Sequence, residues 1–224
     1  MDGINEKDEF TPASLLKVPI MMSVYKLADE DKTFLSKKII DEVSSNGIVQ
    51  DIVPTVQMIR GNNYTIEELV ERMIIYSDNE AKNLLISQIK DNDQVQIYKD
   101  LGMAVPGVVS VDDYMSVHTY SSFFRILYNG SYLSRNLSNK ALELLSRSDF
   151  KDGLVAGLPA NIKVSHKYGE RGLKDGIKQL HDCGIIYSKD DPYILCVMTR
   201  GYDWQNQADV LKNISKMVYE VVKN

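Results

Sequence analysis

The sequence predicts an α+β fold in which helices come first along the chain and an antiparallel sheet, covered by a last helix, comes at the end. Apolar residues recur at helical spacing from residue 15 onward, and from Ile162 the spacing changes to the alternation typical of strands. With 224 residues the chain can bury a substantial core. We expect one domain, 1–224, with a helical lobe over about 14–160 and a sheet with its final helix over about 161–224.

The composition limits the class of protein. Charged residues make up 25% of the chain and hydrophobic residues 44%, which is ordinary for a globular protein. A net charge of -5, a pI near 5.3 and the lack of a basic patch argue against a nucleic-acid partner. The first ten residues are polar and acidic, and no apolar run approaches the roughly 18 residues of a membrane span, so neither a signal peptide nor a spanning segment is predicted.

The helices are predicted from apolar spacing and from their start and stop signals. The expected helical segments are 15–27 after Thr11-Pro12, 31–45 ended by Asn46-Gly47, 65–76 opened by the capping box Thr65-Ile66-Glu67-Glu68, 80–90, about 95–101, 119–128 ended by Asn129-Gly130, and a helix from about 137 with Ser138 as its cap. Residues 49–64 are expected to be rich in loops. A long irregular segment is expected over 102–118, and loops of this length are usually functional or mobile.

The last third predicts three strands and a covering helix. The expected strands are 162–167, 179–188 and 193–200, the last two form a hairpin that turns at 189–192, and the helix is 205–222. If Ser188 faces Tyr193, then Cys196 faces Ile185 and Cys183 is only a diagonal neighbour. We therefore expect two buried free thiols, with a disulfide as the alternative.

Ser14 and Lys17 form the first candidate for chemistry. Thr11-Pro12 predicts a helix start, so both residues lie near its first turn, and residues three apart share one face of a helix. A serine is a poor nucleophile until a neighbouring base takes its proton, and a lysine becomes that base when burial or a second cation favours its neutral form. Free NH groups at a helix start can also stabilise an oxyanion. The alternative is that Ser14 only caps the helix.

Two other polar groups are placed to meet that pair. Ser77-Asp78-Asn79 follows the end of a predicted helix, where side chains can enter a cleft, although residues that merely cap the neighbouring helices show the same pattern. His166-Lys167-Tyr168-Gly169 stands at the end of the first predicted strand. There Lys167 can point into the same cleft, and Gly169 can let a substrate backbone approach closely. A solvated lysine is the alternative.

In this order, Ser14-x-x-Lys17, Ser77-Asp78-Asn79 and Lys167-Tyr168-Gly169 resemble the Ser-x-x-Lys, Ser-Asp-Asn and Lys-Thr-Gly signature of class A β-lactamases and penicillin-binding proteins. The likeness extends from about Phe10 to the final helix. It implies a β-lactamase/D,D-peptidase-like fold and a serine hydrolase that uses no metal or cofactor. The implied substrate is a small-molecule β-lactam or a D-alanyl-D-alanine stem peptide of peptidoglycan.

The resemblance also implies roles for the residues of the reaction. Ser14 would form the acyl-enzyme, and Lys17 would accept its proton. Ser77 would relay a proton to the leaving nitrogen, and Asn79 would hold Lys17 and the amide side chain of the substrate. The oxyanion hole would consist of the backbone NH of Ser14 and that of Glu170, whose side chain is not implicated.

The third motif carries the expected binding of the substrate. Lys167 would bind the substrate carboxylate and keep Lys17 neutral by repulsion of like charges. Tyr168 and Gly169 would line the same place, but Tyr168 stands where the family has Thr or Ser, so a bulky ring replaces a small hydroxyl. His166 is expected to be structural, with an influence on pH dependence as the alternative.

The segment from Gly102 to His118 departs from the class A pattern. Class A enzymes carry there a glutamate that activates the deacylating water, whereas this segment has none. Its only carboxylates, Asp112 and Asp113, are one methylene shorter and are suited to capping a turn. Efficient hydrolysis of β-lactams is therefore less well supported by the sequence than acylation, which favours an enzyme that releases the acyl group poorly.

The start of the chain also departs from the family, which places a helix and two strands before the nucleophile. Thirteen residues precede Ser14, so the N-terminal helix and two strands are expected to be missing, and we expect either a trimmed chain or a partner segment that supplies the strands. Because the substrates of the family lie outside the cytoplasmic membrane, an extracytoplasmic location is expected. Two other hypotheses stay open. One is a D,D-peptidase or slow esterase that is acylated by β-lactams but hydrolyses the acyl-enzyme poorly, and the other is a catalytically weak binding or sensor domain.

Overall fold

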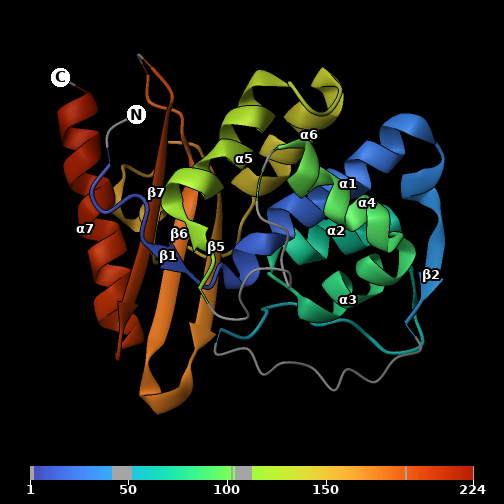
Figure 1. Cartoon of the computed structure of the whole chain (residues 1–224), viewed down its shortest axis with the longest axis horizontal. Coiled ribbons are helices and arrows are strands. Elements are labelled where there is room, and N and C mark those ends of the chain that lie inside the picture. The colour runs from blue at the N-terminus through green and yellow to red at the C-terminus, as the bar shows by residue number, and fades with distance from the viewer. Residues whose placement is uncertain (1–2, 42–51, 102, 104–112, 190, 224) are drawn as a thin grey trace.

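The protein places a three-stranded antiparallel sheet beside a group of helices (Figure 1). The computed structural model describes residues 3–41, 52–101, 103, 113–189 and 191–223. The sheet has the order β5 (Val164–Gly172), β6 (Lys178–Ile186) and β7 (Tyr193–Gly201), and α7 (Trp204–Val222) packs on its side away from the other helices. The predicted α+β class is confirmed.

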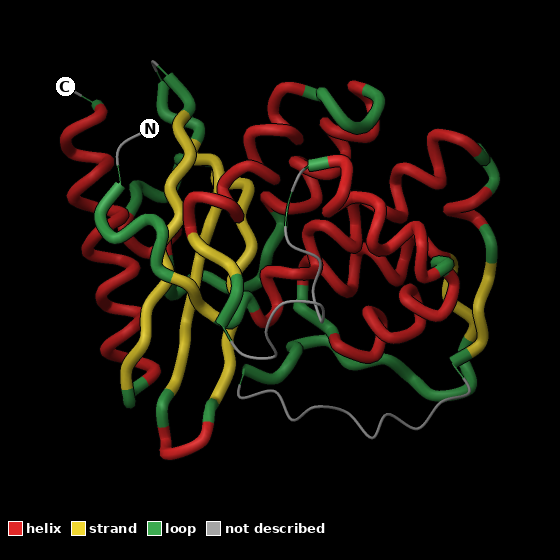
Figure 2. Tube along the Cα trace, viewed as in Figure 1, coloured by secondary structure: helices red, strands yellow, loops and turns green. Residues whose placement is uncertain are grey.

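The remaining elements lie mostly on the other side of the sheet (Figure 2). The helices are α1 (Lys17–Glu30), α2 (Ile66–Ile75), α3 (Asn79–Gln88), α4 (Asp91–Asp100), α5 (Val117–Asn129) and α6 (Arg135–Ser146). The short strands β1 (Glu9–Phe10) and β4 (Met115–Ser116) pair with each other, as do β2 (Lys38–Ile40) and β3 (Asn63–Thr65). Within the described residues, no helix is both long and apolar enough to span a membrane.

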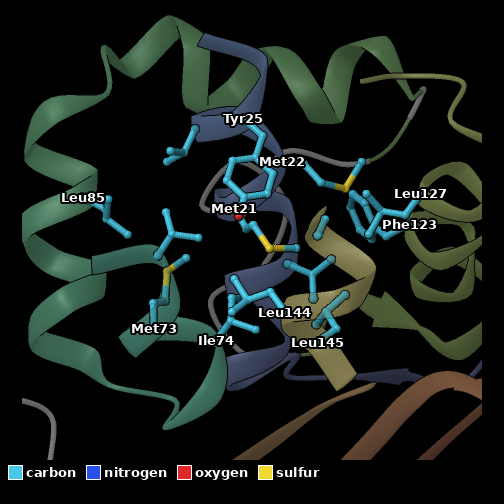
Figure 3. Packing of buried hydrophobic residues seen from close by; sticks show 14 of the residues in the cluster. Met21, Met22, Tyr25, Met73, Ile74, Leu85, Phe123, Leu127, Leu144 and Leu145 are labelled. Atoms are coloured by element: carbon cyan, nitrogen blue, oxygen red, sulfur yellow. The ribbon is translucent and has the colours of Figure 1, made fainter. Parts of the chain in front are cut away.

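Helix α1 runs through the centre of the helical group, as its almost continuous apolar sequence predicts. Met21, Met22 and Tyr25 are at most 1% exposed. Side chains from four other helices surround them (Figure 3), namely Met73, Ile74, Leu85, Phe123, Leu127, Leu144 and Leu145. Each fully buried side chain of this size contributes about 1.5–3 kcal/mol. The first residue of α1 is therefore held by the best packed part of the molecule.

Most predicted helix ends are confirmed, and one cap is wrong. Thr65 and Glu68 form the capping box, with Glu68 N donating to Thr65 Oγ1 at 3.1 Å and Thr65 N donating to Glu68 Oε2 at 2.7 Å. Gly130 ends α5 in the left-handed conformation with a φ of 61°. The cap of α6 is Ser134, not Ser138, because the helix begins one turn earlier than its apolar residues indicate.

The helix predicted over 31–45 is wrong for the residues that the structure describes. A 3₁₀ turn over Phe34–Ser36 is followed by β2, which pairs with β3, while 42–51 lies outside the described residues. Asp31 explains the difference, since its carboxylate accepts hydrogen bonds from the N and the Oγ1 of Thr33 at 2.9 and 2.7 Å. Such local bonds compete with a helix.

The predicted register of the hairpin is also wrong, by two residues. Tyr193 pairs with Ile186 instead of Ser188, and Cys183 lies directly opposite Cys196. Tyr187 N donates to Lys163 O at 3.0 Å, in the segment before β5, and not to the strand β7. Pairing between β6 and β7 therefore ends at Ile186, two residues before the position expected from the turn at 189–192. The expectation of free thiols is corrected with it, because Cys183 and Cys196 form a disulfide between β6 and β7.

The disulfide gives a first testable prediction. In denaturant without reductant, the protein should take up no iodoacetamide, and after reduction it should take up two labels, as counted by intact mass. Cys183→Ser combined with Cys196→Ser should lower the free energy of unfolding by about 2–4 kcal/mol, because the unfolded chain loses its crosslink. Two labels on the denatured, unreduced protein would show that the thiols are free.

Candidate active site

Ser14 lies in a short 3₁₀ helix, Ala13–Leu16, that leads directly into α1. Leu15 N donates to Pro12 O at 2.9 Å, so the helical start predicted after Thr11-Pro12 is confirmed. Ala13 has a φ of 48°, in the left-handed region that a residue with a Cβ rarely adopts. Such a residue costs about 1–3 kcal/mol and persists where the surroundings fix it. This turn presents a half-buried Ser14.

Lys17 connects the first two predicted motifs. Its Nζ lies 2.9 Å from Ser14 Oγ, and it also contacts the carbonyl O and the Oγ of Ser77 at 2.5 and 3.0 Å. The side chain is 1% exposed. The amine of Lys17 therefore connects the first turn of α1 with the residue just after α2, 60 residues further along the chain.

Lys167 completes the cluster from the sheet. Its Nζ donates to Ser77 Oγ at 2.9 Å and to the backbone O of Tyr168 at 3.0 Å. Lys167 stands in the middle of β5 and not at the end of a strand, because β5 continues to Gly172. The cluster of Ser14, Lys17, Ser77 and Lys167 is thus assembled from three distant parts of the chain.

Burial makes both lysines unusually poor cations. Burial lowers the pKa of Lys17 well below its usual range, and the positive charges of Lys167 and Lys82 lower it further. Burial also lowers the pKa of Lys167 to about 7, although Asp182 and Glu170 act in the opposite direction. An uncharged Lys17 next to Ser14 can accept a proton, which a fully charged one cannot.

The Ser-Asp-Asn triplet divides between the cluster and a helix cap. Ser77 lies just after the end of α2, with a φ of 55°, and is fully buried. Asp78 caps α3 by accepting hydrogen bonds from Glu80 N and Ala81 N at 2.8 and 3.2 Å. Asn79 is half-buried in the first turn of α3, and among the described residues it makes no side-chain hydrogen bond to Lys17. Ser77 therefore lies in the cluster with the two lysines, Asp78 is a helix cap, and a catalytic role for the triplet stays a prediction.

Gly169 allows β5 to lie against the turn of Ser14. A Cβ at this position would stand 2.8 Å from Pro12 O and 3.0 Å from Leu15 Cγ. The chain's own turn at Pro12 and Leu15 thus lies close to Gly169, and the approach of a substrate at this residue stays a prediction. The neighbouring Glu170 has a role that the sequence did not reveal, because its side chain accepts a hydrogen bond from Ile52 N at 2.7 Å.

Sequence reasoning missed a polar network beneath the same turn. Asp113 Oδ1 accepts hydrogen bonds from Thr11 Oγ1 and Gln179 Nε2, both at 3.0 Å. Asp113 Oδ2 pairs with Arg200 at 2.5 Å, and Gln179 Oε1 accepts from Thr11 N at 3.0 Å. Burial opposes ionisation of Asp113, but these hydrogen bonds and the Arg200 charge lower its pKa. The sequence signal that could have indicated this network is the pair Gln179 and His181. These polar residues are two apart in a buried strand, so they point to the same face of the sheet.

His166 lies next to Lys167 but turns to another partner. Its Nδ1 is 2.8 Å from Asp182 Oδ1, and Asp182 Oδ2 accepts a hydrogen bond from Leu154 N at 3.0 Å. His166 and Asp182 are both fully buried. The pair joins β5, β6 and the segment after α6, which agrees with a structural role for His166.

The fold and this cluster together define a class of protein, the serine hydrolases in which a lysine stands beside the nucleophile. Residues 2–222 match the family described as "Beta-lactamase2: Beta-lactamase enzyme family". The chain belongs to this family, as the three motifs predict.

Known relatives show how far the similarity extends. Beta-lactamase VEB-1 of Pseudomonas aeruginosa is 24% identical over 207 residues, which are 82% of this chain and 67% of that protein. The TLA-3 extended-spectrum beta-lactamase structure has a TM-score of 0.84 at 17% identity, with 99% of this chain and 88% of that chain covered. PBP-A has a TM-score of 0.80 at 20% identity, with coverages of 98% and 84%. The predicted β-lactamase/D,D-peptidase-like fold is confirmed.

The contact at Gly169 predicts a sensitive position. Gly169→Ala should lower the free energy of unfolding by about 1–3 kcal/mol and slow any reaction of Ser14, because the new methyl group pushes the turn that contains Ser14 away from β5. Gly201→Ala is the matched control, since its nearest atoms would be 3.6 Å away. Thermal unfolding and labelling of Ser14 measure the two effects. Equal behaviour of the two variants would contradict the tight contact.

The lowered pKa of Lys17 predicts the pH dependence of the site. With Lys17 as the predicted base for Ser14, the rate of reaction at Ser14 should rise with pH around a midpoint below the usual lysine range. Lys167→Met removes a positive charge that lowers the pKa of Lys17, and the midpoint should move to higher pH. Lys82→Met should cause a smaller shift in the same direction. An unchanged midpoint in Lys167→Met would rule out this coupling.

Proposed function

We propose that the protein forms an acyl-enzyme on Ser14 with β-lactam or D-alanyl-D-alanine-like substrates. The observation that carries the proposal is the 2.9 Å contact between Ser14 Oγ and Lys17 Nζ, at a lysine whose pKa is lowered by burial. A serine and a base at this distance are an activated nucleophile. The family to which the chain belongs supports the same chemistry.

Acylation begins with a proton transfer. The uncharged Nζ of Lys17 takes the hydroxyl proton of Ser14, and the oxygen attacks the carbonyl carbon of the substrate. Lys17 then passes its proton to Ser77 Oγ, 3.0 Å away, while the hydroxyl proton of Ser77 goes to the leaving nitrogen. The carbon–nitrogen bond breaks, and the acyl group stays on Ser14. Lys167, 2.9 Å from the same Oγ, keeps Lys17 uncharged through repulsion.

Backbone groups and Asn79 complete the proposed site. The NH groups of Ser14 and Glu170 stabilise the oxyanion, since Ser14 starts a helix and Glu170 lies on the strand that packs against that turn. Asn79 binds the amide of the substrate's acyl side chain, because Ser77 O already holds Lys17.

The substrate class is proposed from the relatives. One is named Beta-lactamase VEB-1, and a PBP-A variant similar to this chain is described as an acyl-enzyme complex with penicillin G. That structure covers 99% of this chain with a TM-score of 0.80. A β-lactam is therefore the first compound to test, and an extracytoplasmic location is proposed for the same reason.

A second candidate is a D,D-peptidase or slow esterase that is acylated by β-lactams but hydrolyses the acyl-enzyme slowly. The arrangement of Asp113 favours it, because both oxygens of its carboxylate are already engaged by Thr11, Gln179 and Arg200. Asp112 lies outside the described residues. A catalytically weak binding domain is less well supported, because the contacts from Ser14 through Lys17 and Ser77 to Lys167 are unbroken.

The nucleophile is tested by labelling with a fluorescent penicillin. The wild-type protein should gain one adduct by intact mass, and Ser14→Ala should gain none. Ser87→Ala, which changes an exposed serine on α3, is the control and should be labelled like the wild type. An adduct on Ser14→Ala at the wild-type rate would show that the assigned nucleophile is wrong.

The fate of the acyl group separates the two candidates. We expect nitrocefin to give a burst of about one equivalent followed by slow turnover, because residues 102–118 contain no glutamate and Asp113 is engaged by Thr11, Gln179 and Arg200. Intact mass over time should show an adduct that persists. Rapid turnover without accumulation of an adduct would instead favour an efficient β-lactamase.

A further inference from the structure

The ammonium group of Lys167 is surrounded by groups of the protein itself. Two oxygen acceptors, Ser77 Oγ and the backbone O of Tyr168, lie at 2.9 and 3.0 Å, and the centroid of the Tyr168 ring lies 4.0 Å from Nζ. An ammonium group has three donors, and an aromatic face attracts a cation. The side chain is 0% exposed. The charge of Lys167 is therefore satisfied within the chain and is not presented to a ligand.

Tyr168 is fixed in the position that covers this charge. Its ring stacks on Phe150 with 4.3 Å between the centroids and 23° between the planes. Both rings belong to a buried apolar cluster with Leu180, Ala208 and Leu211, against which Ile52 packs. A side chain held between such neighbours does not move aside without loss of packing.

A cavity of about 190 Å³ adjoins Tyr168. Its walls come from residues 52–55, Tyr76, residues 149–152 and Tyr168. The charged side chains of this lining are two carboxylates, Asp149 and Asp152, and one lysine, Lys151, whose Nζ donates to Ser148 O at 2.5 Å. Such a lining repels an anion, while its three aromatic rings, from Tyr76, Phe150 and Tyr168, and its aliphatic side chains fit an apolar group.

On the basis of the acyl transfer proposed for Ser14, we propose that Tyr168 makes the site selective for uncharged substrates. The favoured substrate carries an ester, an amide or an apolar group, and no free carboxylate, beside the bond that Ser14 attacks. Of the reactions proposed above, this favours an esterase over a D,D-peptidase, because a D-alanyl-D-alanine substrate ends in a free carboxylate. The ring of Tyr168 withholds the Lys167 charge from a carboxylate, and the adjoining cavity receives the apolar group. Among β-lactams, those with a masked carboxylate react best.

The test compares benzylpenicillin with its methyl ester, which differ only in the charge of one group. The second-order rate constant for acylation of Ser14 is measured for both by intact mass. In the wild type the ester should react at least as fast as the acid. In Tyr168→Thr, which removes the ring, the ratio of acid to ester should rise about tenfold or more. Tyr168→Phe keeps the ring and should keep the wild-type ratio.

A wild-type protein that reacts about tenfold faster with the acid than with the ester overturns the proposal. An unchanged ratio in folded Tyr168→Thr does the same. If Tyr168→Thr does not fold, Phe150→Leu, which removes the stacking partner, replaces it and should raise the ratio in the same direction.

The failure of acyl transfer itself is recognised separately. If neither compound forms an adduct on folded wild-type protein, the proposed function fails. Equilibrium binding of both compounds to Ser14→Ala then decides the selectivity. Binding of the ester at least as tight as that of the acid supports the role of Tyr168, whereas tighter binding of the acid, or no binding of either, contradicts it.

Discussion

The whole site depends on two buried lysine side chains that share one hydroxyl. Lys17 and Lys167 approach Ser77 Oγ at 3.0 and 2.9 Å, and both are at most 1% exposed. Removal of an ion from water costs several kcal/mol, and two like charges at one acceptor add to that cost. The lowest free energy is reached when a proton leaves the cluster. The fold thus favours the uncharged form of Lys17 next to Ser14 through burial and repulsion between positive charges, against the opposite effect of Asp78 and Glu170.

This arrangement requires unusual backbone at two places. Lys17 contacts both the carbonyl and the hydroxyl of Ser77, which is possible because the φ of 55° at Ser77 turns both groups toward the amine. Ala13, with a φ of 48°, is the second such residue, and it turns the backbone directly before Ser14. Each conformation costs about 1–3 kcal/mol. The core around α1 and the hydrogen bonds of Thr11 to Asp113 and Gln179 hold these residues in place.

The sequence predicted what depends on local pattern and missed what depends on distant contacts. The capping box at Thr65, the end of α5 at Gly130 and the start of the Ser14 turn are local signals, and each is confirmed. The register of the hairpin depended on where the loop opens. Tyr187 decides this through a bond to Lys163, which no local pattern reveals.

The same division applies to the candidate site. The motifs identified Ser14, Lys17, Ser77 and Lys167, which the structure brings together. Two features of the site were not predicted. Among the described residues, Asn79 makes no hydrogen bond to Lys17, and the side chain of Glu170 accepts a hydrogen bond from Ile52 N. Both outcomes depend on atoms from distant segments, where a sequence motif gives residue types but no directions.

Lys167 is fully buried, yet it has to stay charged in order to repel a proton from Lys17. The carboxylates of Asp182 and Glu170 oppose the effect of burial on its pKa. Burial alone would leave Lys167 uncharged, and an uncharged Lys167 could not repel a proton from Lys17. Asp182 and Glu170 raise its pKa against the effect of burial, with a result of about 7. Asp182 is fixed by His166 and by Leu154 N, and Glu170 is fixed by Ile52 N. The burial of Lys17 is the largest cause of its lowered pKa, and these carboxylates add an indirect effect because they help to keep Lys167 charged.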